Sequence, residues 1–96
     1  MKINELRDGM RKVNLEGNVI QKSDAREVRS KYTNETFKVA DAIIEDETGT
    51  VTLPLWNEDI NRVRAGDRVA IENGYIKSFR NQLQLNVGKY GVLKIL

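Results

Sequence analysis

The residues best suited to bind a ligand in this 96-residue sequence are aromatic, and the first of them is Trp56. In residues 51–56 an aliphatic side chain recurs at every second position, which predicts a strand with two different faces. Leu53 and Leu55 fall on one face, and Trp56 falls on the other beside Pro54. If the leucines fill a core, Trp56 points outward. Pro54 cannot donate to a β-ladder, so it predicts an edge or an irregular stretch of this strand.

Two more aromatic residues repeat this phase further along the chain. Tyr75 and Phe79 share one face of a predicted strand, with Lys77 between them and Ile76 on the opposite side. Exposed apolar patches of this kind mark binding sites. Bases stack on aromatic rings with little regard to their sequence, while neighbouring cations bind phosphates. The pattern therefore favours a single-stranded nucleic acid as the ligand, with structural cover over the end of the fold as the alternative role for these rings.

Polar residues near the three aromatic ones complete the predicted site. The segment 23–35 is a long polar loop with some strand character, and it supplies cations and one further aromatic ring. We expect bases to stack on the three rings and cations to bind phosphates, with solubility alone as the alternative role for the loop residues. The additional residues predicted to contribute are Lys77, Arg80, Arg29, Lys31, Tyr32 and Gln84.

The distribution of charge supports a locally positive surface better than the total does. The formal net charge is only +2, which by itself argues weakly for a nucleic-acid partner. However, residues 1–34 carry +3, residues 35–59 carry −6 and residues 60–96 carry +5. Two basic stretches thus flank an acidic one, and a patterned surface of this kind can produce a positive field that the total conceals.

The composition excludes most catalysis. The sequence contains no His and no Cys, which removes imidazole and thiolate chemistry, disulfides and the usual zinc sites. The carboxylates Asp46 and Glu47 belong to a predicted turn, and Glu58 and Asp59 to a helix start, where acidic residues are favoured. We therefore expect no enzyme activity, no metal, no cofactor and no small-molecule substrate.

The elements needed to position these residues are short strands. Alternation predicts five of them, with a short helix between the third and the fourth and a possible closing strand in residues 90–96. This order indicates an all-β chain folded as a single OB-fold domain over residues 1–96, a five-stranded Greek-key barrel. An SH3-like barrel is the structural alternative. No apolar run is long enough to span a membrane, and we expect a cytoplasmic protein.

Three local expectations are specific enough to be checked. Phe37 shares its phase with Val39 and Ile43, so we expect it in the core. Asn57 is expected to cap the short helix. Residues 73–74, Asn-Gly, interrupt the alternation and predict a bulge in the fourth strand.

Several motifs resemble one known family across most of the chain, from about Leu6 to Gly88. The sequence Asp-Glu-Thr-Gly at residues 46–49, followed by a strand ending in Trp56, is similar to the signature of archaeal single-stranded-DNA-binding proteins. The family includes replication protein A-like OB domains and small eukaryotic single-stranded-DNA sensors. Further matching segments are residues 24–26, 42–43, 66–71, 73–75 and 79–88.

This resemblance implies an OB-fold that binds single-stranded DNA with little sequence preference, in DNA replication, recombination or repair. It also implies that the rings of Trp56, Tyr75 and Phe79 stack on bases. Replication or repair proteins are the protein partners that it suggests, and no membrane is implied. Two alternatives stay open: an OB domain that binds another protein within a replication protein A-like complex, and an OB domain that binds RNA.

Overall fold

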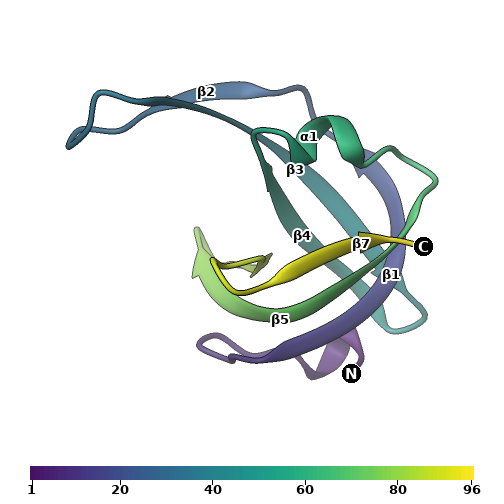
Figure 1. Ribbon diagram of the computed structural model, residues 1–96. Coiled ribbons are helices and arrows are strands. Elements are labelled where there is room, and N and C mark those ends of the chain that lie inside the picture. The colour runs from purple at the N-terminus through teal and green to yellow at the C-terminus, as the bar shows by residue number, and fades with distance from the viewer.

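Seven strands form in the computed structural model, which describes residues 1–96 (Figure 1). As the sequence predicts, a short helix lies between the strand ending in Trp56 and the following one. The elements in chain order are the 3-10 helix η1 (Ile3–Glu5), β1 (Val13–Lys22), β2 (Arg26–Arg29), β3 (Thr36–Asp46), β4 (Gly49–Trp56), α1 (Asp59–Arg62), β5 (Arg68–Phe79), β6 (Gln82–Asn86) and β7 (Val92–Ile95).

Five of these strands close into a ring (Figure 1). β1 pairs with β5 along its first half and with β3 along its second half, and β4 and β6 complete the circle between β3 and β5. The seam between β4 and β6 is parallel and joins Thr52 to Gln84. β7 pairs with β5, which confirms that the C-terminal segment returns to the sheet.

The inside of the ring is filled by aliphatic side chains, and no polar or charged residue is buried. The largest fully enclosed side chains include Ile44, Leu53, Leu55, Ile71 and Leu85. Burial of this kind contributes roughly 1.5–3 kcal/mol per large side chain relative to leaving it in water. The core therefore stabilises the ring from inside and leaves its outer face free to carry other residues.

The pairing of β3 with β4 decides which side chains face outward. The tight turn at residues 46–49 sets a register in which Ala40 lies opposite Leu55 and Val39 lies opposite Trp56. Directly opposite residues of an antiparallel pair share a face. The even-numbered side chains of β3 therefore lie inside the ring, and its odd-numbered residues belong to the outer face with Trp56, where Val39 is covered and only 2% exposed.

The expectation that Phe37 belongs to the core is consequently wrong. The core side chains of β3 are Ala40, Ala42 and Ile44, each with none of its surface exposed, whereas Phe37 is only half-buried. β3 is apolar on both faces, so its polarity pattern does not distinguish inside from outside. Its partner strand makes that distinction.

β2 extends β3 into an arm that projects beyond the ring (Figure 1). The predicted long loop is therefore partly a strand, since Arg26 pairs with Val39 and Arg29 with Thr36. All four residues of β2 are exposed, so backbone pairing rather than a buried face holds the arm together. Only residues 30–35 remain as the loop at its tip.

The expectation that Asn57 caps the short helix is wrong. It adopts a left-handed backbone conformation with φ 51°, and its side-chain oxygen accepts a hydrogen bond from the backbone N–H of Lys38 at 3.1 Å. Its own N–H donates to the Lys38 carbonyl at 2.8 Å. Asn57 thus ties the end of β4 to β3.

No helix in the structure is long and apolar enough to cross a membrane.

The predicted bulge in β5 is confirmed. The register between β1 and β5 shifts between Val13 and Leu15, and Asn73 takes φ 56°. The backbone N–H of Asn73 donates to the side-chain oxygen of Asn14 at 2.9 Å. The bulge lies two residues before Tyr75, on the path of the chain toward the predicted site.

β1 approaches β3 so closely that only glycine fits at position 17. A Cβ atom there would lie 2.5 Å from Cγ2 of Ile44 and 2.9 Å from the carbonyl oxygen of Glu45. One of these contacts is with backbone, which cannot rotate away as a side chain can. Gly17 therefore allows the two strands to meet at the seam that closes the ring.

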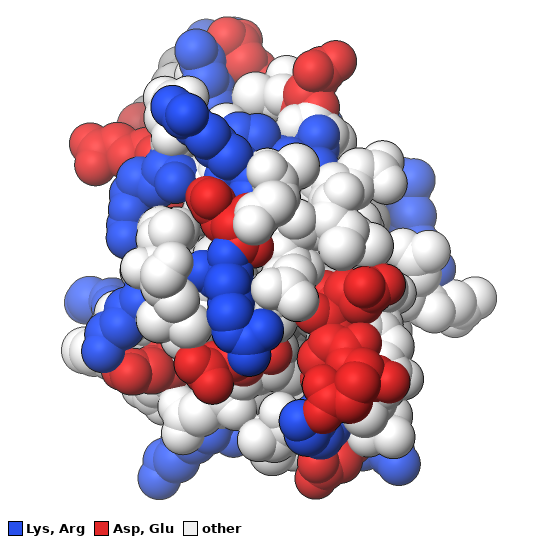
Figure 2. Space-filling model, turned by 90° about the vertical axis from the view of Figure 1, so that its right-hand side faces the viewer, with Lys and Arg blue, Asp and Glu red and all other residues white.

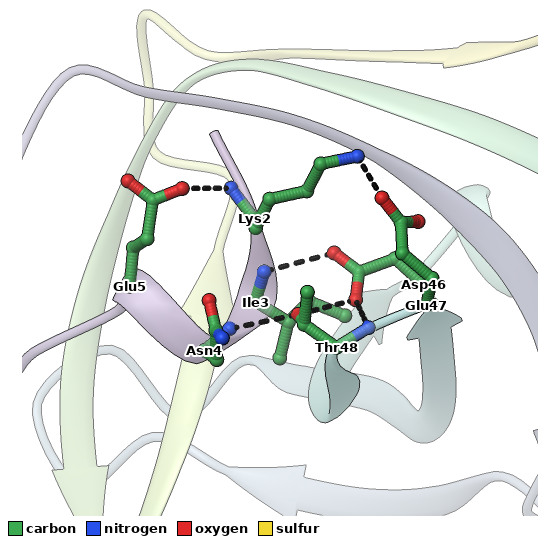
Figure 3. A network of polar contacts seen from close by, with 7 residues as sticks. All are labelled: Lys2, Ile3, Asn4, Glu5, Asp46, Glu47 and Thr48. Atoms are coloured by element: carbon green, nitrogen blue, oxygen red, sulfur yellow. Dashed lines mark hydrogen bonds and ion pairs between the residues drawn. The ribbon is translucent and has the colours of Figure 1, made fainter.

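The N-terminus is fastened to the turn between β3 and β4 by a polar network (Figure 3). Asp46 accepts hydrogen bonds from the backbone N–H of Ile3 at 2.8 Å and of Thr48 at 2.7 Å, and from the Thr48 hydroxyl at 2.6 Å. Lys2 forms an ion pair with Glu47. Partial burial raises the pKa of Asp46, but hydrogen bonds from Thr48, Ile3 and Gly49 outweigh it and lower that pKa to about 2.

This network predicts an acid-sensitive contribution to stability. Because the folded-state pKa of Asp46 lies below its ordinary value of 3.8, the contribution is complete above about pH 4 and is lost as the pH falls toward about 2. We expect Asp46→Asn to lower the free energy of unfolding at pH 7 by on the order of 1 kcal/mol. Urea unfolding between pH 2 and pH 7 should show a smaller pH dependence for the variant. An identical dependence in both proteins would contradict this role.

Candidate nucleic-acid interface

The outer face of the ring is continuous from Trp56 to the aromatic residues of β5. Pairing of β5 with β6 puts Lys77 opposite Gln84, and Gln84 in turn lies beside Thr52 of β4. Thr52 has the same phase as Trp56, and Lys77 has the same phase as Tyr75. The same pairing places Tyr75 opposite Asn86 and Phe79 opposite Gln82. One surface across β3, β4, β6 and β5 therefore carries all three predicted stacking residues.

The three rings point outward, as the sequence predicts. Trp56 is 43% exposed, Tyr75 is 41% exposed and Phe79 is 54% exposed, whereas Ile76 retains only 2%. Leaving large aromatic side chains in water costs hydrophobic free energy, and a patch of them on the surface usually marks a binding site. The exposure shows that these rings are not part of the core and are available to a ligand.

Trp56 borders a hollow of about 460 Å³ along the β2–β3 arm. The hollow is lined by Val28, Ser30, Phe37, Trp56 and Asn57, so a second aromatic ring lies beside the tryptophan and no charged side chain lines it. Phe37 was not among the residues predicted to form the site. The tight turn before Gly49 could have revealed it, because that turn sets the register that places Phe37 on the Trp56 face.

Phe37 is therefore expected to matter for binding more than for folding. We expect Phe37→Ala to weaken oligo-dT binding by about 1 kcal/mol, the lower end for loss of one stacking ring. Replacement of a core residue such as Leu53 by alanine should instead cost about 2–5 kcal/mol of stability. Fluorescence titration and urea unfolding of both variants separate the two effects. A larger loss of stability than of affinity for Phe37→Ala would return it to a structural role.

Phe79 lies next to a tight two-residue turn between β5 and β6. Arg80 and Asn81 both take left-handed conformations, with φ 52° and 63°, which is the geometry of a type I′ hairpin turn. The Arg80 guanidinium carbon lies 5.2 Å from the centre of the Phe79 ring, within range of a cation–π contact. Arg80 is thus held next to an exposed ring, where it can reach a phosphate beside a stacked base.

The other predicted residues fall into two groups. Arg29 ends β2, and Lys31 and Tyr32 lie at the tip of the arm, where Tyr32 is 97% exposed. Lys77 and Gln84 lie opposite one another across β5 and β6. Neither Arg29, Lys31, Lys77 nor Arg80 takes part in an ion pair. The structure therefore places these cations at two ends of the aromatic face rather than in one cluster around Trp56.

A compact group of acidic side chains lies on another side of the molecule. Figure 2 views the side that carries the C-terminus in Figure 1 and shows Asp and Glu side chains gathered at its lower right, with Lys and Arg spread over its left and centre. The largest hollow, about 650 Å³, is lined by Glu16, Glu45, Asp46, Glu47 and Glu72 together with Lys2 and Arg68. No group of His, Cys, Asp and Glu side chains is arranged to hold a metal ion. This hollow repels phosphates and is a poor candidate for the nucleic-acid site.

A closed five-strand ring with a helix between β4 and β5, and with its aromatic residues on the outer face, defines the OB-fold class of binding domains. Residues 6–95 match the family model described as "Single-stranded DNA binding protein Ssb-like, OB fold". The chain belongs to this family, which confirms the resemblance and the predicted fold. Because the family is one of binding proteins, it also agrees with the expectation that the chain is not an enzyme.

Individual relatives point the same way. The chain is similar to the single-stranded DNA binding protein Ssb of Saccharolobus solfataricus, with 37% identity over 87 residues. This match includes 91% of the chain but 57% of that relative, so the chain spans a little more than half of its length. Among solved structures it resembles the replication factor A related protein from Methanobacterium thermoautotrophicum, with a TM-score of 0.79, 25% identity and coverage of 100% and 89% of the two chains. The second OB-fold domain of replication protein A from Methanococcus maripaludis shares the fold, with a TM-score of 0.80, 24% identity and coverage of 100% and 93%.

Proposed function

We propose that this chain binds single-stranded DNA with little sequence preference, through bases stacked on Trp56, Tyr75 and Phe79. The observation that carries the proposal is the exposure of all three rings on one continuous outer face of the ring. Each stacked base contributes about 1–3 kcal/mol before the cost of ordering the strand. Stacking does not distinguish one base from another strongly, which accounts for the low sequence preference.

Phosphates are bound by the cations at the two ends of this face. Lys77 and Arg80 serve the Tyr75–Phe79 end, and Arg29 and Lys31 serve the arm beside Trp56. Gln84, which is half-buried between β4 and β5, and Tyr32 at the tip of the arm add hydrogen-bonding groups. Membership of the single-stranded DNA binding family supports single-stranded DNA as the ligand, since the relative with 37% identity carries that name.

The salt dependence of binding tests the phosphate contacts. About three to four contacts imply that the logarithm of the binding constant falls with the logarithm of salt concentration with a slope near −2 to −3. Titration of oligo-dT at two or more salt concentrations, followed by the fluorescence of Trp56, measures this slope. A flat salt dependence would remove the cations from the interface, and an absence of binding at low salt would overturn the proposed function.

The same titration with oligo-rU addresses the alternative ligand. A groove that uses the 2′-hydroxyl prefers RNA, whereas a stacking face that ignores the sugar binds both strands. We expect oligo-dT to bind at least as tightly as oligo-rU.

The wider role that follows is protection or presentation of single strands in DNA replication, recombination or repair, with replication or repair proteins as partners.

A further inference from the structure

Another hollow, lined by basic and aromatic residues, adjoins Tyr75 on the side of β5 that lies next to the N-terminal segment. It has a volume of about 440 Å³, and none of its lining residues was predicted to bind a ligand except Tyr75. Its lining residues are Arg11, Lys12, Asn73, Gly74, Tyr75, Gly88, Lys89 and Tyr90. Tyr90 is 79% exposed.

Backbone pairing outside the regular strands builds one wall of this hollow. The N–H of Ile76 donates to the carbonyl of Met10 at 2.8 Å, and the N–H of Gly9 donates to the carbonyl of Ile76 at 3.0 Å. These bonds fasten the segment before β1 alongside β5. Arg11 and Lys12, which follow Met10 directly, are thereby held beside Tyr75.

A turn between β6 and β7 builds the opposite wall. The N–H of Gly91 donates to the carbonyl of Gly88 at 3.0 Å, and the side-chain amide of Asn73 donates to the carbonyl of Tyr90 at 3.4 Å. A Cβ atom on Gly88 would lie 3.0 Å from Cε1 of Tyr75, so the tyrosine ring packs directly over this glycine. Tyr75 thus forms the boundary between the hollow and the stacking face.

The charge of this hollow is uniformly positive. Arg11, Lys12 and Lys89 supply three cations, and no carboxylate lines the hollow. None of the three cations takes part in an ion pair. The ammonium group of Lys89 lies 5.7 Å from the centre of the Tyr90 ring. Unpaired cations beside an exposed aromatic ring form the combination that binds a nucleotide, with phosphate on the cations and base on the ring.

We propose that this hollow binds the strand beyond Tyr75, with a base against Tyr90 and phosphates on Arg11, Lys12 and Lys89. The inference rests on the proposed function, because it extends the same single strand past the three-ring face. It predicts that affinity for oligo-dT rises with length after the first site is filled. The added affinity should depend on residues that short oligonucleotides do not contact.

Oligonucleotide length provides the test. Fluorescence of Trp56 is titrated with oligo-dT of about five and about ten nucleotides, a range within the site sizes of OB-folds. We expect Tyr90→Ala to weaken binding of the longer strand about 5-fold or more while changing binding of the shorter one less than about 2-fold. The double variant Lys12→Gln, Lys89→Gln should do the same and should also lower the salt slope for the longer strand only.

The matched control removes two cations elsewhere. Arg64→Gln, Lys94→Gln changes the net charge equally, but Arg64 precedes β5 and Lys94 pairs with Glu72 on the β7 side. This control should leave both affinities within about 2-fold of the wild type, apart from a general field effect. Circular dichroism and urea unfolding confirm that each variant is folded.

The outcomes separate this inference from the proposed function. If the wild type binds both lengths and the Tyr90 and lysine variants weaken neither, or weaken both equally, the second hollow is not a separate subsite. The inference then fails and the proposed function stands. If the wild type binds neither length, the proposed function fails and the inference fails with it. If the variants lose affinity for the longer oligonucleotide alone, the result supports both the inference and the proposed function.

Discussion

Replacing Trp56 by alanine is expected to weaken oligo-dT binding by about 1–3 kcal/mol, or about 5- to 150-fold. The ring is exposed on the outer face and makes no part of the core, so the effect should fall on binding and not on folding. Trp56 is the only tryptophan in the sequence, and quenching of its fluorescence by oligo-dT reports directly on contact with a base. Affinity of the non-fluorescent variant is measured by anisotropy of a labelled oligonucleotide.

Trp56→Phe is the matched control for this prediction. A phenylalanine retains an aromatic face for stacking, so it should recover most of the affinity that alanine loses. Urea unfolding of both variants should give free energies within about 0.5 kcal/mol of the wild type. An affinity of Trp56→Ala equal to that of the wild type would take Trp56 out of the interface.

The second large effect is expected from Gly17→Val, which should lower the free energy of unfolding by about 3 kcal/mol. The added side chain would meet Ile44 and the backbone of Glu45 at distances that real atoms avoid. Because one of these partners is backbone, β1 and β3 must separate locally to make room. Chemical denaturation followed by the fluorescence of Trp56 measures the change.

Glu16→Val tests whether position or residue type causes this loss. Glu16 precedes Gly17 in β1 and is exposed, so a valine there points toward solvent and not toward the close contact between β1 and β3. We expect its unfolding free energy to stay within about 0.5 kcal/mol of the wild type. Equal stability of Gly17→Val and Glu16→Val would show that β1 can move away from β3 without cost.

The strands of the ring and the order of its elements could be predicted because their residues alternate and their turns are marked. Val51, Leu53 and Leu55 recur at every second position, and Gly49 marks the turn before them. Phe37 was assigned to the wrong face because β3 is apolar on both sides, so that only its pairing with β4 decides. β2 was predicted only as strand character within a long loop, because its four residues are all exposed and leave no alternation of buried and exposed positions.

The outward orientation of Trp56, Tyr75 and Phe79 could also be predicted, since each is out of phase with core residues of its own strand. Their surroundings could not. Phe37 joins Trp56 from a strand that begins 20 residues earlier than it. Arg11 lies beside Tyr75 because the backbone carbonyl of Met10 accepts a hydrogen bond from Ile76, which is distant in the sequence. Local periodicity carries no information about such pairings, because register and irregular backbone contacts create them.

Closure of the ring also decides where another polypeptide could add a strand to this molecule. A free strand edge is a template for pairing with a second chain and thus for aggregation. Each ring strand has a partner on both sides, although β4 and β6 meet at a single residue pair, so the strands with one side free throughout are β2 and β7, each four residues long. Charged side chains protect β2, which carries Arg26, Glu27 and Arg29, whereas β7 carries Lys94 beside the exposed Val92 and Ile95 and is limited mainly by its short length. The molecule can therefore keep three bare rings in water while offering neighbouring copies little backbone on which a fibril could grow.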